Sequence, residues 1–290
     1  MQLDIFEHSR DVMLRNDVVH ALEQRDAAMA RLAWGALATE CPHDPSLPAL
    51  LVLAEAIQAS SQSAFRDHDA LGHARQAVED DIQPAALRTF GESGAAAWLC
   101  PLWQELAQRA ASLAFRADRG EDHAAALWLR AENWKTAVDA VVAIKSWRRI
   151  PAPLAWMAEA RVHLYGLQPT WAMLTELAWL SPRRFSELVQ RLGDPILQQL
   201  SRRFEASFEG VGDASDLAWF PAWLLTDRPD LAVHLGAAQL SLDGAPEQAM
   251  RVLVELLGLE RQGRHHDIIA RRKTLRDLHS SLYAAYMKTR

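Results

Sequence analysis

The sequence predicts an all-α protein, and three observations support this fold class. Apolar residues recur at three- and four-residue steps, as in residues 25–42, where Ala30, Trp34, Leu37 and Ala38 fall on one helical face. Prolines and glycines interrupt the chain where such runs stop. No alternating β-branched run is flanked by Asn-Gly or Asp-Gly, so the pattern of a β-hairpin is missing.

The predicted helices follow one another with short connections between them. They lie at residues 25–42, 47–59, 64–79, 95–117, 121–131, 133–146, 153–165, 170–180, 184–192, 195–208, 217–226, 230–242, 246–257 and 264–287. Ser181 before Pro182 and Asp194 before Pro195 are expected to cap the helices that follow, because their side chains can accept a hydrogen bond from a free backbone N–H group. Gly193 lies where the preceding helix should end.

A small residue follows several of the predicted turns at a similar distance. Asn133 is followed by Ala137 after four residues and by Val141 after eight, and residues 25–42 and 243–258 show a similar order. This order resembles the tetratricopeptide-repeat family, in which a small residue near the start of a helix packs against its partner helix. The resemblance covers about half of the chain, in four candidate units at residues 10–42, 122–151, 153–182 and 230–258.

The resemblance implies a right-handed superhelix, or solenoid, of antiparallel helix pairs with irregular repeats. Trp134 would fill the junction between the two helices of a pair, and Ala137 would be small because another helix backbone approaches it. Residues 60–115 and 183–225 show no clean repeat, so they are either degenerate repeats or a separate helical unit. An irregular helical domain with a chance similarity in its turns is the alternative.

The acidic stretch at residues 208–216 is the one loose segment between predicted helices. It is either a linker or a long loop. As a linker, it would divide the chain into a helical-repeat region at residues 1–208 and a second one, with a basic terminal helix, at residues 217–290. As a loop, it would leave one continuous domain.

The composition is that of a cytoplasmic protein. The net charge is −6, the first residues carry charges throughout, and no window approaches the roughly 18 uninterrupted apolar residues of a membrane span. Cys41 and Cys100 have no second Cys or His at the spacing of zinc ligands, so we expect both to be small apolar residues. The excess of Arg over Lys, 27 against 4, is typical of bacteria with GC-rich genomes.

No sequence motif indicates a catalytic centre, a metal site or a cofactor. His68 and His73 are five residues apart, which puts them on different faces of a helix, and His265 and His266 are adjacent. HExxH, GxGxxG, GxxxxGK[ST] and GxSxG are all missing. We therefore expect no catalytic, cofactor-binding or metal-ligating residues, although an enzyme with dispersed catalytic residues is an alternative.

The C-terminal segment is basic, and it supplies the first candidate partner-binding residues. Residues 259–290 carry eight basic and three acidic side chains, and we assign partner binding to Arg264, Arg272, Lys273 and Arg276. Such a segment could lie on an acidic part of the same chain, bind an acidic protein, or contact nucleic acid. Aromatic residues are not interleaved with the basic ones, so we expect little affinity for nucleic acid and propose another protein, as a peptide or helix in a concave groove, as the partner.

Residues 216–225 supply the second set of candidate partner-binding residues. Trp219, Phe220 and Trp223 are concentrated there around Pro221. Aromatic residues at helical spacing usually fill a core, but they can also form an exposed patch for a partner. The sequence favours the core and leaves the patch as the functional alternative. In either case the fold class predicts a non-catalytic scaffold for protein–protein interaction.

Overall fold

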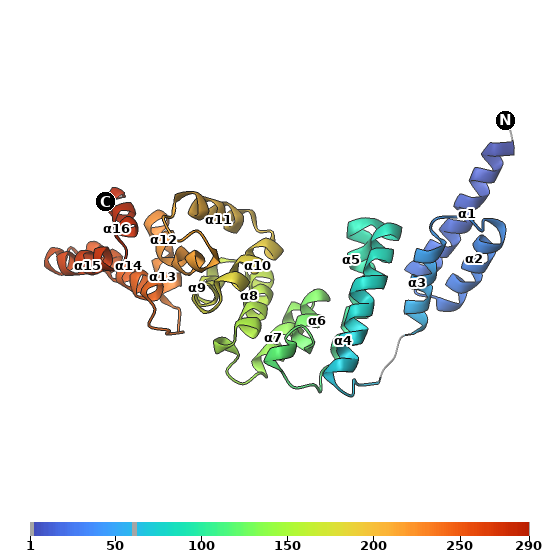
Figure 1. The fold of residues 1–290 in the computed structure, drawn as a ribbon, viewed down its shortest axis with the longest axis horizontal. Coiled ribbons are helices and arrows are strands. Elements are labelled where there is room, and N and C mark those ends of the chain that lie inside the picture. The colour runs from blue at the N-terminus through green and yellow to red at the C-terminus, as the bar shows by residue number, and fades with distance from the viewer. Residues whose placement is uncertain (1–2, 60–62, 290) are drawn as a thin grey trace. The chain divides into compact units, whose positions relative to one another are not determined.

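The computed structural model describes residues 3–59 and 63–289, and these form helices and connecting loops without a strand (Figure 1). The prediction of an all-α protein is therefore confirmed. The chain divides into two compact units, Met1–Asn133 and Trp134–Arg290. The predicted boundary at residues 208–217 falls inside the second unit, because the acidic stretch there is a closed loop held by its own hydrogen bonds. No helix in the described part of the chain is both long and apolar enough to cross a membrane.

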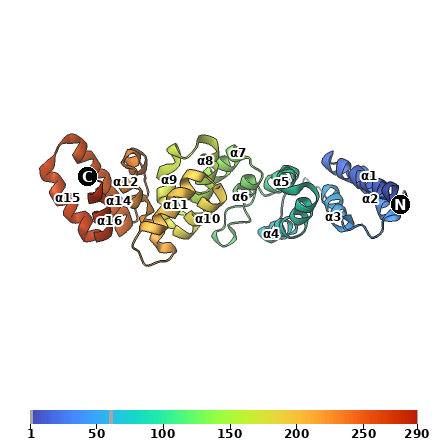
Figure 2. The same ribbon diagram turned by 90° about the horizontal axis from the view of Figure 1, so that it is seen from above.

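The first unit consists of consecutive helices that fold back on one another. They are α1 (Leu3–Glu23), α2 (Ala27–Glu40), α3 (Leu47–Gln58), α4 (His68–Ala77), a π-helix (Val78–Ile82), α5 (Gln83–Arg109) and α6 (Ala124–Arg130). α1 packs along α2, α2 against α3, and α3 against α5. Figure 2 shows α1, α2 and α3 side by side.

The turn between α1 and α2 explains why a small residue follows Asp26. The Asp26 side chain accepts a hydrogen bond from the backbone N–H of Met29 at 2.9 Å and thereby caps α2. Ala30, one residue later, is fully buried, as expected for a residue at a close approach between helices. The predicted helix pair at residues 10–42 thus corresponds to α1 and α2.

The predicted helices at residues 64–79 and 95–117 correspond to a helix pair, although this part of the sequence shows no clean repeat. α4, the π-helix and the first part of α5 form one helical stretch, which reverses direction at Gly91 (φ 68°, ψ 179°). After this reversal, the end of α5 lies beside the start of α4, because the Phe65 N–H donates to the Arg109 carbonyl at 3.0 Å. Only glycine adopts the backbone angles of Gly91 without strain.

The second unit contains the remaining helices. They are α7 (Trp134–Val142), α8 (Pro151–Tyr165), α9 (Trp171–Leu180), α10 (Pro182–Leu192), α11 (Pro195–Ser207), α12 (Phe220–Asp227), α13 (Ala232–Gly236), α14 (Ala245–Gln262), α15 (His265–Leu278) and α16 (Ser280–Lys288). A 3₁₀-helix at Ala214–Trp219 precedes α12. Asp194 caps α11 as predicted, since its side chain accepts a hydrogen bond from the Leu197 N–H at 2.9 Å. Ser181 precedes α10 but makes no side-chain capping bond.

α7 and α8 form the helix pair to which Trp134 and Ala137 contribute. The indole ring of Trp134 stacks on the imidazole ring of His163 in α8, with ring centroids 3.9 Å apart. Ala137 and Val141 lie on the same face of α7 and are fully buried. The small side chain of Ala137 therefore permits the close packing of α7 on α8.

The predicted helix at residues 264–287 is interrupted at His279. The backbone of His279 is extended (φ −159°, ψ 107°), and its ring Nδ1 accepts a hydrogen bond from the Leu282 N–H at 3.2 Å. His279 therefore caps α16 and separates it from α15. Figure 2 shows α14, α15 and α16 grouped together, in agreement with their contacts.

We expect Ala137→Leu to destabilise the second unit, because a larger side chain would be forced between α7 and α8. The expected loss is about 1–3 kcal/mol in the free energy of unfolding. Thermal unfolding followed by circular dichroism measures this loss. Ala143→Leu, at an exposed position just beyond α7, is the matched control and should unfold like the wild type. Equal unfolding of both variants would contradict the close approach at Ala137.

We expect His123 to make the first unit sensitive to acid. Its Nδ1 accepts a hydrogen bond from the Ala125 N–H at 3.1 Å, which requires the neutral ring, and burial lowers the pKa of His123 to about 4. The unfolded chain takes up this proton near pH 6.5, so stability should fall as the pH decreases from about 6.5 towards 4, by at most roughly 3 kcal/mol. Urea unfolding measures the free energy of unfolding across this pH range. His123→Asn keeps a capping oxygen but does not titrate, so its free energy of unfolding should fall less than that of the wild type as the pH decreases. An identical pH dependence in both proteins would refute the assignment.

Candidate functional site

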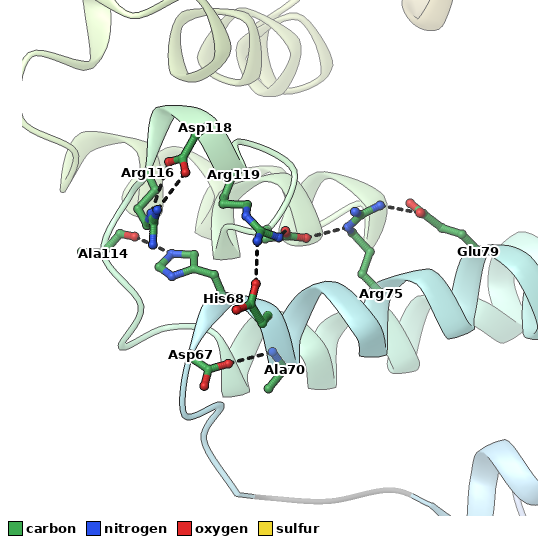
Figure 3. A network of polar contacts seen from close by, with 11 residues as sticks. Asp67, His68, Ala70, Arg75, Glu79, Ala114, Arg116, Asp118 and Arg119 are labelled. Atoms are coloured by element: carbon green, nitrogen blue, oxygen red, sulfur yellow. Dashed lines mark hydrogen bonds and ion pairs between the residues drawn. The ribbon is translucent and has the colours of Figure 1, made fainter.

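Charged side chains in the first unit form a network that links the start of α4 to the segment before α6 (Figure 3). Arg75 donates to the buried Asp122 carboxylate at 2.8 Å and also pairs with Glu79. Arg119 pairs with Asp69 at 2.6 Å, and His68 is hydrogen-bonded to the Ala114 carbonyl at 2.9 Å. These charges are neutralised within the network, so its evident role is to hold the segments together.

The histidines considered as metal ligands lie at different places in the structure. Within the described part of the chain, no group of three or more His, Cys, Asp or Glu side chains is arranged to hold a metal ion. His73 and His266 are exposed, whereas His68 belongs to the network of Figure 3. The side chain of His265 lies outside the part that the structure describes.

Three of the four basic residues assigned to partner binding have an acidic neighbour close by. Arg264 pairs with Asp267 at 2.6 Å, and Arg276 lies 4.0 Å from Asp277. Arg272 lies 3.6 Å from Glu260 and donates to the hydroxyl of the buried Tyr286 at 3.4 Å. Lys273 is exposed. Three of the assigned residues thus have an acidic neighbour, but the segment stays basic, because residues 259–290 carry eight basic and three acidic side chains.

The aromatic residues assigned to partner binding lie in or beside the core. Phe220 and Trp223 are only 2% and 7% exposed, while Trp219 is half-buried. They belong to an aromatic cluster in which neighbouring ring centroids lie between 4.6 and 6.2 Å apart. Its members are Phe185, Phe204, Phe208, Trp219, Phe220, Trp223 and His279. This burial favours the core interpretation of residues 216–225.

A cavity of about 650 Å³ lies next to the aromatic cluster, and we call it the docking cavity. It is lined by α11, the loop after it, the 3₁₀-helix Ala214–Trp219, and Ser186 of α10. Several lining residues are exposed, including Glu205 and Gly212, so the cavity opens to solvent. Its size is within the range of pockets that bind small ligands.

The floor of the docking cavity is aromatic. Phe204 and Phe208 line it, four residues apart, and their rings stack with centroids 4.7 Å apart. Phe220 and Trp223 meet the ring of Phe204 edge-on, at 5.6 and 5.5 Å. The buried residues 220–223 thus support the floor from behind, which fixes the orientation of Phe204.

Phe208 is held by a different set of rings. Its ring lies 5.0 Å from the imidazole of His279 and 6.2 Å from the indole of Trp219. Burial lowers the pKa of His279, although the nearby Asp216 and Glu209 oppose this effect. A neutral His279 can both cap α16 and pack against Phe208.

Four carboxylates surround the docking cavity, those of Glu205, Glu209, Asp213 and Asp216. Their observed hydrogen bonds come from uncharged groups: the Ser201, Ser215 and Ser281 hydroxyls and the backbone N–H groups of Val211, Gly212 and Ser215. Throughout the described residues, none of the four forms an ion pair with Arg, Lys or His. The cavity therefore combines an aromatic floor with uncompensated negative charge.

Asp216 organises the loop that forms one wall of the docking cavity. Its carboxylate accepts hydrogen bonds from the N–H groups of Val211 at 2.9 Å and Gly212 at 2.7 Å. Gly210 lies directly against this carboxylate, where there is no room for a β-carbon. The sequence of this stretch is acidic and contains no motif of a binding site, since only the folded loop brings its carboxylates next to Phe204 and Phe208.

Comparison with known proteins does not assign a function to this arrangement: no protein-family model matches the chain, and no significant match is found among curated proteins or solved structures. A concave aromatic surface with polar groups at its edge is the usual form of a binding site.

We expect Gly210→Ala to disorder the wall of the docking cavity, because the added β-carbon would collide with the Asp216 carboxylate. The loss of the two loop hydrogen bonds should destabilise the second unit by about 1–3 kcal/mol. Gly258→Ala is the control, since the Gly258 position in α14 is open and alanine favours a helix. Calorimetric unfolding compares the two variants. A Gly210→Ala protein as stable as the control would show that the wall does not depend on this contact.

Proposed function

We propose that this protein is a non-catalytic scaffold for protein–protein interaction, and that the docking cavity receives a side chain from a partner protein. The observation that carries this proposal is a cavity of about 650 Å³ with an aromatic floor and four carboxylates that have no ion-pair partner among the described residues. Aromatic anchoring pockets surrounded by polar groups are typical centres of protein interfaces.

The arrangement of the helices supports a scaffold. Antiparallel pairs such as α1 with α2 and α7 with α8 bury their apolar faces against each other and leave other faces exposed. The tetratricopeptide-like pattern of small residues at these pairs, with Ala30 and Ala137 fully buried, agrees with the same class of protein. Interaction is the usual role of such helix-pair proteins.

The charges around the docking cavity favour a protein partner over nucleic acid. Four carboxylates would repel a phosphate backbone at this site. The basic residues that suggested nucleic-acid binding, Arg264 and Arg272 among them, are already close to acidic side chains.

A photo-crosslinking amino acid placed in the docking cavity tests this proposal. Introduced at Ala214, which lines the cavity, it should attach to a distinct partner protein in cells of the native organism. The control position is Ala206, which is exposed on α11 but does not line the cavity. The expected result is a protein adduct from position 214 alone, identified by mass spectrometry. Equal adducts from both positions, or an adduct with nucleic acid, would contradict the proposal.

A further inference from the structure

We propose that His279 is a pH-sensitive switch whose protonation weakens the attachment of α16 and loosens the docking cavity. This regulation acts on the proposed scaffold, so its effect on a partner rests on the proposed function. His279 forms the break between α15 and α16, and its ring also contacts the ring of Phe208. One imidazole ring therefore connects a short terminal helix to a residue that lines the docking cavity.

The hydrogen bond at the start of α16 requires a neutral His279. Its Nδ1 accepts the N–H of Leu282 at 3.2 Å, and this nitrogen accepts a hydrogen bond only while it carries no proton. Protonation removes the acceptor and places a positive charge at the N-terminus of a helix, where the helix dipole is also positive. α16 has only nine residues, and helices of this length are not stable in water by themselves. The loss of its cap therefore weakens α16 at the end where it leaves α15.

Burial and two carboxylates act on the ring of His279 in opposite directions. Burial is the larger effect and lowers the pKa of His279, whereas the negative charges of Asp216 and Glu209 oppose this shift. The ring is therefore neutral at neutral pH and takes up a proton below about pH 6.5, the usual value for histidine. Both carboxylates line the docking cavity, and they attract the ring once it is charged. The two protonation states of His279 thus favour different partners for the same ring.

The other charged side chains near α16 form pairs with one another. These pairs are Arg276 with Asp277, Arg203 with Asp227 of α12, and Arg272 with Glu260. The first pair is exposed next to the ring in the chain, and the third contacts the Tyr286 hydroxyl at the far end of α16. In the described part of the chain, the charges that act on the ring of His279 are those of Asp216 and Glu209. Its protonation is therefore governed by burial and by the carboxylates of the cavity.

Two contacts connect the start of α16 to the docking cavity. The ring of His279 lies 5.0 Å from the ring of Phe208, and the Ser281 hydroxyl donates a hydrogen bond to Glu209 at 2.6 Å. Both Phe208 and Glu209 line the cavity, and neither belongs to α16. When α16 detaches, Phe208 loses one of the rings that hold it and Glu209 loses a hydrogen-bond donor. The protonation of His279 should therefore loosen the cavity together with the helix.

Hydrogen–deuterium exchange followed by mass spectrometry measures this opening in the full chain. Between about pH 7.5 and about pH 5, the protection of residues 280–288, corrected for the intrinsic exchange rate, should fall at least about threefold. The protection of residues 208–216 should fall with it, whereas α9 should keep its protection. An α16 whose protection does not fall in the wild type would overturn the proposal. An equal fall in α9 would show unfolding of the whole unit and refute a local switch.

Two matched variants assign the change to His279. Asn also caps a helix but does not titrate, so His279→Asn should show a smaller fall in the protection of α16 between the two pH values. His266→Asn is the same substitution at an exposed position of α15 and should respond to pH like the wild type. Each protein is compared with itself at the two pH values, so a uniform loss of stability does not affect the comparison. An equal fall in all three proteins would refute the role of His279.

An NMR titration reports the protonation of the ring directly. The imidazole signal that is missing in His279→Asn belongs to His279, and its midpoint should lie below that of an exposed histidine, about pH 6.5. Glu209→Gln keeps an acceptor for the Ser281 hydroxyl but removes a negative charge, so it should lower this midpoint further. An unchanged midpoint in Glu209→Gln would contradict the connection between the ring and the cavity.

Photo-crosslinking at position 214 separates the switch from the proposed function. In extracts of the native organism, the adduct from position 214 should decrease at least about threefold between the same two pH values. An adduct that stays constant while α16 opens would refute the effect on the cavity. If α16 opens and position 214 gives no adduct at either pH, the switch stands and the scaffold function is refuted.

Discussion

The constraint on which most of this structure depends is that a carboxylate buried between helices must be matched by an arginine. Glu176 has no solvent exposure, and its carboxylate accepts hydrogen bonds from Arg148 and from the backbone N–H of Gln239. This single group joins α9 to two loops that are distant in sequence. Because an unpaired buried charge would cost several kcal/mol, each such pair fixes the relative position of the segments that supply it.

The carboxylates at the docking cavity differ from these buried ones in their exposure to solvent. In the first unit, Asp122 is buried and matched by Arg75, and the network around it holds α4 close to the start of α6. At the docking cavity the carboxylates are accessible to water, so they can persist without a cation. They keep the loop ordered through backbone hydrogen bonds instead, above all those of Asp216. Negative charge thus remains available to a partner without a large cost in stability.

The negative charge at the docking cavity is local and differs in sign from the net charge of the second unit. The first unit carries 20 acidic and 11 basic side chains, whereas the second carries 17 acidic and 20 basic ones. The acidic cavity therefore lies in the unit with a net positive charge. Because screening limits the reach of exposed charges to about 8 Å at physiological salt, recognition at this site depends on the groups that line it. Its aromatic floor is positioned by rings from α11, α12 and the His279 break between α15 and α16.

The sequence by itself determined the local features of this protein. Helical periodicity gave the all-α class, Asp194 was readable as a cap, and Ala30 and Ala137 were readable as small residues at close contacts. These features depend on residues within one or two helical turns, so their physical causes are contained in short stretches of chain.

Only the tertiary structure decided the reversal at Gly91, the break at His279 and the docking cavity. Gly91 lies between the predicted helices at residues 64–79 and 95–117, and apolar residues continue on both sides of His279, so the local pattern shows neither the direction of the reversal at Gly91 nor the break at His279. The sequence also does not indicate which arginine pairs with which carboxylate, because the partners are far apart in the chain. Arg148 and Glu176 are 28 positions apart, and Arg75 and Asp122 are 47 apart. Cavities and ion pairs of this kind arise when distant segments pack together, and a local sequence pattern does not predict that packing.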